Sequence, residues 1–226
     1  MELLEYHFIN LSGNLYYDEK NSTYEMFSNI GTPMHLNYLT FRELFKQMNN
    51  QRNLNILESG ISSAGTFSTY LFNEYIKKFG GHFWSVDINK NLIETHKGNM
   101  CPGTTLVCSD SVKFFSTWCK TNNNLYADVI YLDSWDLDWY NPHPAAIHGL
   151  NEYLSLLPCY KKNTLLLIDD TPSNPYWIDS RGQLYDDMMK YYAINNYLPG
   201  KGQYILNVYK NADVLLHNYQ ILYKFN

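Results

Sequence analysis

Short hydrophobic runs alternate with amphipathic segments along most of the chain. Five of these runs have the near-continuous apolar character of parallel strands that are buried on both faces. They lie at residues 54–58, 82–86, 105–108, 128–133 and 164–169. Helical patterns separate them, at residues 66–79, 89–97, 111–120 and 145–157. This regular alternation predicts a doubly wound parallel α/β sheet with right-handed crossovers.

The segments on either side of this alternation complete the expected fold. Residues 33–48 have a helical pattern, and a further helix is expected at 183–196, after a proline-containing loop. The tail at 214–225 has the pattern of two short strands that turn near His217. Two closing strands added to the five parallel ones predict a seven-stranded sheet.

Composition narrows the class of protein. With 45% hydrophobic and 17% charged residues, the chain has the makeup of an ordered globular protein. We expect a single domain over residues 1–226, in which residues 1–50 form a helical cap over the ligand site. The formal net charge of −5, without any basic run, argues against a nucleic-acid partner.

Cysteine usage and the chain's N-terminus bear on location. The four cysteines are Cys101, Cys108, Cys119 and Cys159, and none shares a CxxC spacing. We expect reduced, mostly packed thiols rather than zinc ligands. No apolar run approaches the ~20 residues of a membrane span, and the N-terminus lacks a leader pattern. The expectation is a cytoplasmic protein without a membrane partner.

A small-residue turn after the first predicted strand is the clearest ligand signal. The strand ends at Glu58, and Gly60, Ser62 and Gly65 follow before the next helix. Small residues at such a turn let the backbone approach a nucleotide-like ligand. Asp87 ends the second strand 22 positions after Gly65, near the ~20-residue spacing of an acid that binds ribose hydroxyls. The two glycines do not form the GxGxxG pattern, and alone they would be weak evidence for a nucleotide-like ligand. Asp87 at the end of the second strand strengthens that evidence.

An acidic residue follows the end of every predicted strand. These residues are Glu58, Asp87, Asp110, Asp133 and the pair Asp169-Asp170. Ligands of doubly wound sheets bind beyond the carboxyl ends of the strands. The fourth and fifth strands should be neighbours, so Asp133, Asp169 and Asp170 could converge on a hard cation such as Mg²⁺. The alternative is that these acids are solvated caps and turns.

The order of these motifs resembles the class I S-adenosylmethionine-dependent methyltransferases. The motifs are Asn29-Ile30-Gly31, Glu58-Ser59-Gly60 with Gly65, Asp87, Asp110-Ser111, Leu132-Asp133-Ser134-Trp135 and Leu167-Ile168-Asp169-Asp170. Within that class the chain is most similar to the metal-dependent catechol O-methyltransferase-like and macrolide-sugar O-methyltransferase groups. The resemblance implies a Rossmann-like fold of five parallel strands and a C-terminal hairpin, with helices on both faces of the sheet.

The resemblance also implies which residues bind the cofactor, S-adenosylmethionine. They are Asn29, Ile30, Glu58, Gly60, Ser62, Gly65, Thr66, Asp87, Asp110, Ser111 and Trp135. In this alignment Asp87 would bind the ribose hydroxyls, and Trp135 would form a packing wall for cofactor or substrate. Asp110 and Ser111 would flank the adenine. Asp133, Asp169 and Asp170 correspond to magnesium ligands.

The chain departs from the catechol enzymes at the base. Those enzymes place a lysine three residues after the first metal aspartate, where this chain has Asp136. The following segment carries His143 between two prolines, a stiff backbone context. Catechol is therefore disfavoured, and a less acidic hydroxyl, as on a sugar, gains weight. The candidate catalytic residues are His143, Asp136 and Asp133. His148 is expected to be an ordinary core or surface histidine.

Several functions stay open at this point. The favoured one is methylation of a hydroxyl of a small molecule or a sugar or glycan, with N-methylation of an amine as a variant. The alternatives are a non-catalytic cofactor-binding or scaffold protein and a NAD-dependent oxidoreductase, which would need a tighter glycine motif. The loop at 171–182 is expected to wall the acceptor site. Oligomeric state is undetermined, with a homodimer as one alternative.

Overall fold

A computed structural model of the protein describes most of the chain. The described residues are 2–26, 33–61, 65–122, 125–178, 183–208 and 212–226. Three predicted cofactor residues, Asn29, Ile30 and Ser62, lie outside them. The end of the predicted acceptor loop, residues 179–182, also lies outside them.

The centre of the molecule is a seven-stranded sheet in the order β6-β5-β4-β7-β8-β10-β9. The parallel strands are β4 (Leu54–Ser59), β5 (Gly81–Asp87), β6 (Thr104–Cys108), β7 (Val129–Leu132) and β8 (Leu165–Ile168). A C-terminal hairpin of β9 (Ala212–His217) and β10 (Ile221–Phe225) joins antiparallel to β8. The prediction of five parallel strands and a closing hairpin is confirmed.

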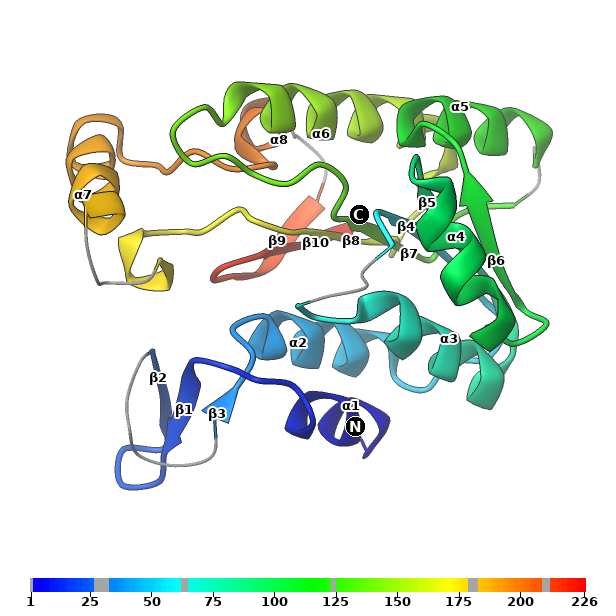
Figure 1. Ribbon diagram of the computed structural model, residues 1–226, viewed down its shortest axis with the longest axis horizontal. Coiled ribbons are helices and arrows are strands. Elements are labelled where there is room, and N and C mark those ends of the chain that lie inside the picture. The colour runs from blue at the N-terminus through cyan, green and yellow to red at the C-terminus, as the bar shows by residue number, and fades with distance from the viewer. Residues whose placement is uncertain (1, 27–32, 62–64, 123–124, 179–182, 209–211) are drawn as a thin grey trace.

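Helices cover both faces of this sheet, as predicted (Figure 1). The helices that follow the first strand are α3 (Ser68–Phe79), α4 (Lys90–His96), α5 (Ser111–Thr121), α6 (His143–Leu156), α7 (Gln183–Asn195) and α8 (Gln203–Val208). Short 3₁₀ turns lie at Lys97–Asn99, Leu157–Cys159 and Pro175–Trp177. Each long helix begins and ends within a few residues of its predicted range. Among the described helices, none is both long enough and apolar enough to cross a membrane.

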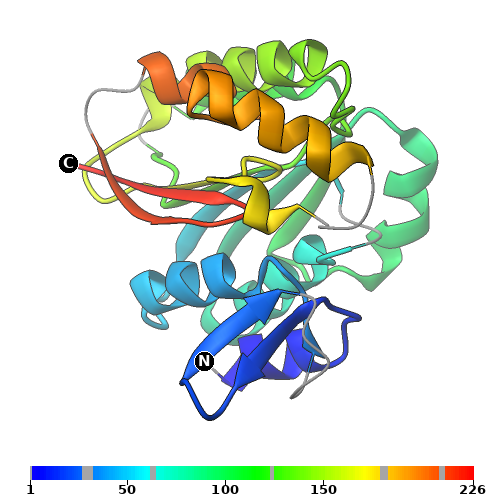
Figure 2. The ribbon, with the colours of Figure 1, turned by 90° about the vertical axis from the view of Figure 1, so that its left-hand side faces the viewer.

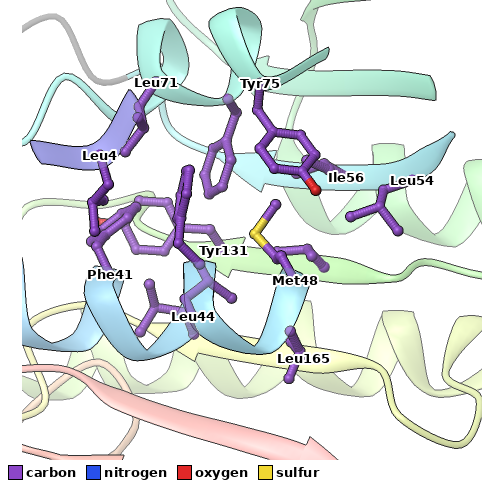
Figure 3. Packing of buried hydrophobic residues seen from close by; sticks show 14 of the residues in the cluster. Leu4, Phe41, Leu44, Met48, Leu54, Ile56, Leu71, Tyr75, Tyr131 and Leu165 are labelled. Atoms are coloured by element: carbon purple, nitrogen blue, oxygen red, sulfur yellow. The ribbon is translucent and has the colours of Figure 1, made fainter. Parts of the chain in front are cut away.

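Alternation along the central strands divides the interior into two cores. On β7, Val129 and Tyr131 pack with residues of α1 (Glu2–Ile9), α2 (Tyr38–Met48) and α3, while Ile130 and Leu132 pack with residues of α5, α6 and α8. Successive side chains of a strand point to opposite faces, so a continuous apolar run fills both layers. Figure 3 shows part of the first core, in which the ring centroids of Phe41 and Tyr131 lie 5.3 Å apart and Leu71 belongs to the same cluster.

The N-terminal region contains strands as well as helices, which corrects the expected helical cap. Its elements are α1 (Glu2–Ile9), β1 (Leu15–Asp18), β2 (Thr23–Met26), β3 (Pro33–Met34) and α2 (Tyr38–Met48). The three strands form a small antiparallel sheet in the order β2-β1-β3, beside α2 (Figure 2). Helix α2 begins later than predicted because Pro33 and Met34 pair with β1. Proline is tolerated there because β3 is an edge strand.

The cysteines also differ from expectation. Cys119 at the end of α5 and Cys159 after α6 form a disulfide with a Cα–Cα distance of 5.6 Å, while Cys101 and Cys108 are free. The two bonded residues are 40 positions apart, and they meet only because α5 and α6 pack side by side. Sequence spacing does not reveal such a pair, so the expectation of four reduced thiols was wrong at these two positions.

Candidate functional site

A cleft of about 750 Å³ lies at the carboxyl ends of the central parallel strands. Its size is typical of small-molecule sites. Many residues that the sequence analysis assigned to the site line it together: Gly60, Asp87, Asp110, Ser111, Asp133, Trp135 and Asp136. They come from the ends of β4, β5, β6 and β7, so these seven residues line one space.

Gly60 lies directly against the backbone that follows β7. It follows β4 with a positive φ of 83°, and its amide donates to the carbonyl of Val86 at 2.8 Å. A Cβ at this position would lie 2.4 Å from the backbone oxygen of Asp133, closer than any real contact. Only glycine therefore allows the ends of β4 and β7 to meet at the floor of the cleft.

Asp87 is held rigidly at the mouth of β5. Its Oδ2 accepts a hydrogen bond from the amide of Ile61 at 3.0 Å, and its Oδ1 accepts from the amide of Asn89 at 2.6 Å. Both donors are backbone groups, so the carboxylate is held in one orientation. A fixed acceptor at this edge of the cleft suits a ligand that offers hydroxyl donors.

A hydrogen-bonded network forms another part of the cleft lining. The Nε2 atom of His148 lies 2.9 Å from Ser111 Oγ and 3.4 Å from Glu152 Oε1. Ser134 Oγ donates to the same Glu152 oxygen at 2.6 Å, and the ring of Trp135 lies 5.3 Å from that of His148. The hydrogen bond and charge of Glu152, which outweigh burial, raise the pKa of His148.

His148 lines the cleft, which the sequence analysis missed. One signal was available. Glu152 follows His148 by four positions, a spacing that places both side chains on one face of a helix. What the sequence could not show is that this face of α6 turns towards Ser111 on α5.

Glu58 lies beneath the cleft rather than in it. It is fully buried, and its two oxygens accept hydrogen bonds from Ser68 at 2.7 Å, Thr69 at 2.6 Å and Ser85 at 2.5 Å. Burial raises its pKa to about 7, although these hydroxyl donors oppose the shift. Its oxygens thus join β4 to β5 and to the first turn of α3. Direct contact with a cofactor stays a prediction.

Gly65 and Thr66 face the N-terminal region rather than the cleft. Gly65 lines a separate pocket of about 460 Å³ together with His35. Thr66 is buried, its Oγ1 accepts from Asn37 Nδ2 at 2.8 Å, and its carbonyl lies 2.8 Å from His7 Nε2. The described part of this turn therefore joins α3 to the N-terminal elements, and a role in cofactor binding stays a prediction.

Asp133, Asp169 and Asp170 converge as the sequence predicted. One carboxylate oxygen of each lies within 4.8 Å of the others. Asp169 Oδ1 accepts from Gln220 Nε2 at 2.7 Å, and Asp170 Oδ1 accepts from Tyr219 Oη at 2.5 Å. Burial raises the pKa of all three carboxyls, that of Asp169 to about 7. Three converging oxygen donors are of the kind that Mg²⁺ binds.

Lys201 was not singled out from the sequence, yet it enters this carboxylate cluster. Its Nζ lies 2.7 Å from Asp133 Oδ1 and 3.0 Å from Asp170 Oδ2, and its side chain is 5% exposed. Burial alone would lower its pKa, but the charges of Asp133 and Asp170 raise it. The three carboxylates are thus of the kind that binds a divalent metal. A metal bound there would have to displace the Lys201 ammonium from Asp133 and Asp170.

The predicted catalytic residues are divided by the structure. Asp133 and Asp136 line the cleft. His143 is the exposed first residue of α6, its Nδ1 lies 2.5 Å from Tyr204 Oη on α8, and it is not among the cleft-lining residues. In the described part of the predicted acceptor loop, Tyr176 Oη instead accepts from the amide of Met26 on β2.

Comparison with solved structures identifies the fold. MycE, a methyltransferase of the mycinamycin biosynthetic pathway solved with Mg and S-adenosylhomocysteine, matches with a TM-score of 0.55 at 14% identity. The match covers 85% of this chain and 50% of MycE, so the chain spans half the length of that relative. SMU.1697c of Streptococcus mutans, solved with S-adenosylhomocysteine, matches with a TM-score of 0.50 at 8% identity over 83% of this chain and 97% of its own.

These likenesses show a class I methyltransferase fold, in agreement with the sheet order and the C-terminal hairpin. No protein-family model matches the chain. No curated protein matches it either.

Proposed function

We propose that this protein is an S-adenosylmethionine-dependent methyltransferase that methylates a hydroxyl of a small molecule or sugar. The observation that carries the proposal is the single cleft in which Gly60, Asp87, Ser111 and Trp135 surround one ligand-sized volume beside Asp133. The methyltransferase fold supports it, as do the S-adenosylhomocysteine complexes of MycE and SMU.1697c.

In this proposal the strand-end residues hold the cofactor. The Asp87 carboxylate, fixed by two backbone amides, accepts hydrogen bonds from the ribose hydroxyls. Asp110 and Ser111 would lie beside the adenine, and Trp135 would pack against the cofactor. When bound, the cofactor supplies a sulfonium methyl that is already activated for in-line attack. The cleft then has to align the acceptor hydroxyl with that methyl and exclude water.

Among the catalytic candidates that the sequence offered, the two carboxylates in the cleft are better placed than His143 to remove the acceptor's proton. Asp133 and Asp136 both line the cleft, which favours them over His143, whose Nδ1 contacts Tyr204 outside the cleft lining. Asp133, Asp169 and Asp170 would hold Mg²⁺, which would lower the pKa of a coordinated hydroxyl. The convergence of their oxygens and the Mg²⁺ in MycE support this finer assignment.

A methyl-transfer screen tests the proposal. Purified protein is incubated with methyl-labelled S-adenosylmethionine and with sugar nucleotides, glycans, catechols or amines, each with and without Mg²⁺. Label in a hydroxyl-bearing product supports the proposal, and label in an amine moves the activity to N-methylation. Tight cofactor binding without transfer to any acceptor would leave a cofactor-binding protein. Binding of NAD in place of S-adenosylmethionine would contradict the proposal.

A further inference from the structure

Backbone hydrogen bonds fix the position of Lys201. Its amide donates to the carbonyl of Asp170 at 3.0 Å, and the next amide, of Gly202, donates to Thr171 Oγ1 at 2.9 Å. A Cβ on Gly200 would lie 2.4 Å from the carbonyl of Asp170. The segment around Lys201 therefore lies directly against the residues that follow β8, with a glycine on each side of the lysine. These backbone contacts place the Lys201 ammonium against the carboxylates of Asp133 and Asp170.

The cluster and the lysine depend on each other. A lysine that is almost fully buried needs partners for its charge, and buried carboxylates need donors or cations. Asp169 is supplied by the amides of Gln220 and Asn37. Asp133 and Asp170 each have a phenol donor and the ammonium of Lys201. Two of the three candidate metal ligands thus already share one cation that the chain itself supplies.

We propose that Lys201 is the resident cation of the Asp133–Asp169–Asp170 cluster, and that its ammonium and a divalent metal are alternative occupants of that cluster. Mg²⁺ requires oxygens at about 2.0–2.1 Å, and two of the three carboxylates that would supply them, those of Asp133 and Asp170, are the carboxylates that Lys201 contacts. Two cations held against the same pair of carboxylates repel each other strongly. Metal binding therefore requires the ammonium to leave, and Lys201 weakens the metal affinity of the site.

The inference rests on the metal-binding part of the proposed function and is independent of the methyl acceptor. Its test is Mn²⁺ binding, measured by electron paramagnetic resonance and calorimetry on the full chain. Lys201→Met should bind Mn²⁺ at least tenfold more tightly than the wild type. Lys46→Met removes an equal charge from an exposed residue of α2 and should match the wild type. Equal or weaker binding by Lys201→Met, or no Mn²⁺ binding by either protein, would overturn the exchange.

A thermal measurement covers the case in which the variant is unstable. Without its ammonium, the cluster keeps unpaired carboxylates, so Lys201→Met should melt at a lower temperature than the wild type in a chelator. Mn²⁺ should restore more stability to the variant than it adds to the wild type, and folding only in its presence also supports the exchange. If Lys201→Met and Lys201→Gln both fail to fold with and without Mn²⁺, metal does not replace the ammonium and the proposal is wrong.

Binding of S-adenosylmethionine to the same variants separates the two proposals. Lys201 is not among the cleft-lining residues, so the cation exchange predicts unchanged cofactor affinity in Lys201→Met. A protein that shows the exchange but binds no cofactor would refute the methyltransferase proposal alone. A protein that binds cofactor equally in all variants but shows no gain in Mn²⁺ affinity would refute the exchange alone.

Discussion

Glu58 and Asp87 end neighbouring strands, yet their surroundings are opposite. Glu58 is fully buried and bonds to three hydroxyl groups, whereas Asp87 lies at the cleft and bonds to two backbone amides. From the sequence alone, both acids were predicted to contact the ligand. The depth of each side chain decides its role, because a carboxylate without solvent favours its protonated form while one fixed at a surface stays an acceptor.

The buried carboxyl of Glu58 should make stability depend on pH. Its pKa is about 7 in the folded protein, against 4.5 in the unfolded chain. Folding therefore favours the protonated carboxyl, whose contribution is complete below the unfolded pKa and is lost as pH rises through the folded one. Relative to Glu58→Gln, the wild type should lose about 3 kcal/mol of unfolding free energy across that window.

Urea denaturation at a series of pH values measures this difference. Other titrating groups are common to both proteins and cancel in the comparison. Glu74→Gln, an exposed change on α3, controls for the loss of a negative charge. Wild-type and Glu58→Gln curves that run parallel from acid to neutral pH would mean that folding does not shift the pKa of Glu58.

Asp87 carries the residue-scale prediction for the cofactor. Asp87→Ala should weaken S-adenosylmethionine binding by about 1–3 kcal/mol, because it removes a charge-assisted acceptor for buried hydroxyls. Calorimetry measures the affinity, and circular dichroism checks the fold. Asp187→Ala, an acid on α7 paired with an exposed lysine, should bind as the wild type does. Unchanged affinity in a folded Asp87→Ala protein would remove Asp87 from the ribose site.

At the scale of elements, periodicity predicts strands and helices well and predicts the segments between them poorly. The apolar runs of β4, β7 and β8 fill two cores, so their pattern is set by burial that the sequence records directly. The start of α2 was missed because Pro33 and Met34 pair with Tyr16 and Leu15 of β1, a pairing that local periodicity does not record. Lys201 was missed because its burial depends on contacts of its loop with Asp170 and Thr171.

The meeting of β4 and β7 gives a prediction at this scale. Gly60→Ala should lower the unfolding free energy by at least about 2 kcal/mol, since a Cβ would strike the carbonyl of Asp133 and the positive φ is strained. It should also weaken cofactor binding by moving the cleft floor. Gly98→Ala is the matched control, because nothing lies within 4 Å of its added Cβ. Equal stability of the two variants in urea would show that the strand ends can separate without cost.

At the scale of the whole molecule, the sequence predicts the strands of the sheet and the helices around it. It does not predict which side chains of separate helices come into contact. The five parallel strands and the hairpin follow from local patterns, and the convergence of Asp133, Asp169 and Asp170 follows from the order of strands in such a sheet. The contact of His148 with Ser111 and the disulfide between Cys119 and Cys159 both depend on how α5 packs against α6. Neither pair has a local signature, so packing alone reveals them.

Cofactor binding should be visible in the stability of the entire domain. A ligand that binds only the folded state adds about 2.7 kcal/mol at a hundredfold excess over its Kd. For a chain of this size that corresponds to a rise in Tm of about 5–10 °C. Differential scanning fluorimetry should show this rise with S-adenosylmethionine and S-adenosylhomocysteine and none with NAD, because the glycine turn lacks the GxGxxG pattern. Asp87→Ala should show a smaller rise at the same ligand concentration. A rise with NAD alone would replace the methyltransferase proposal with an oxidoreductase, despite the fold.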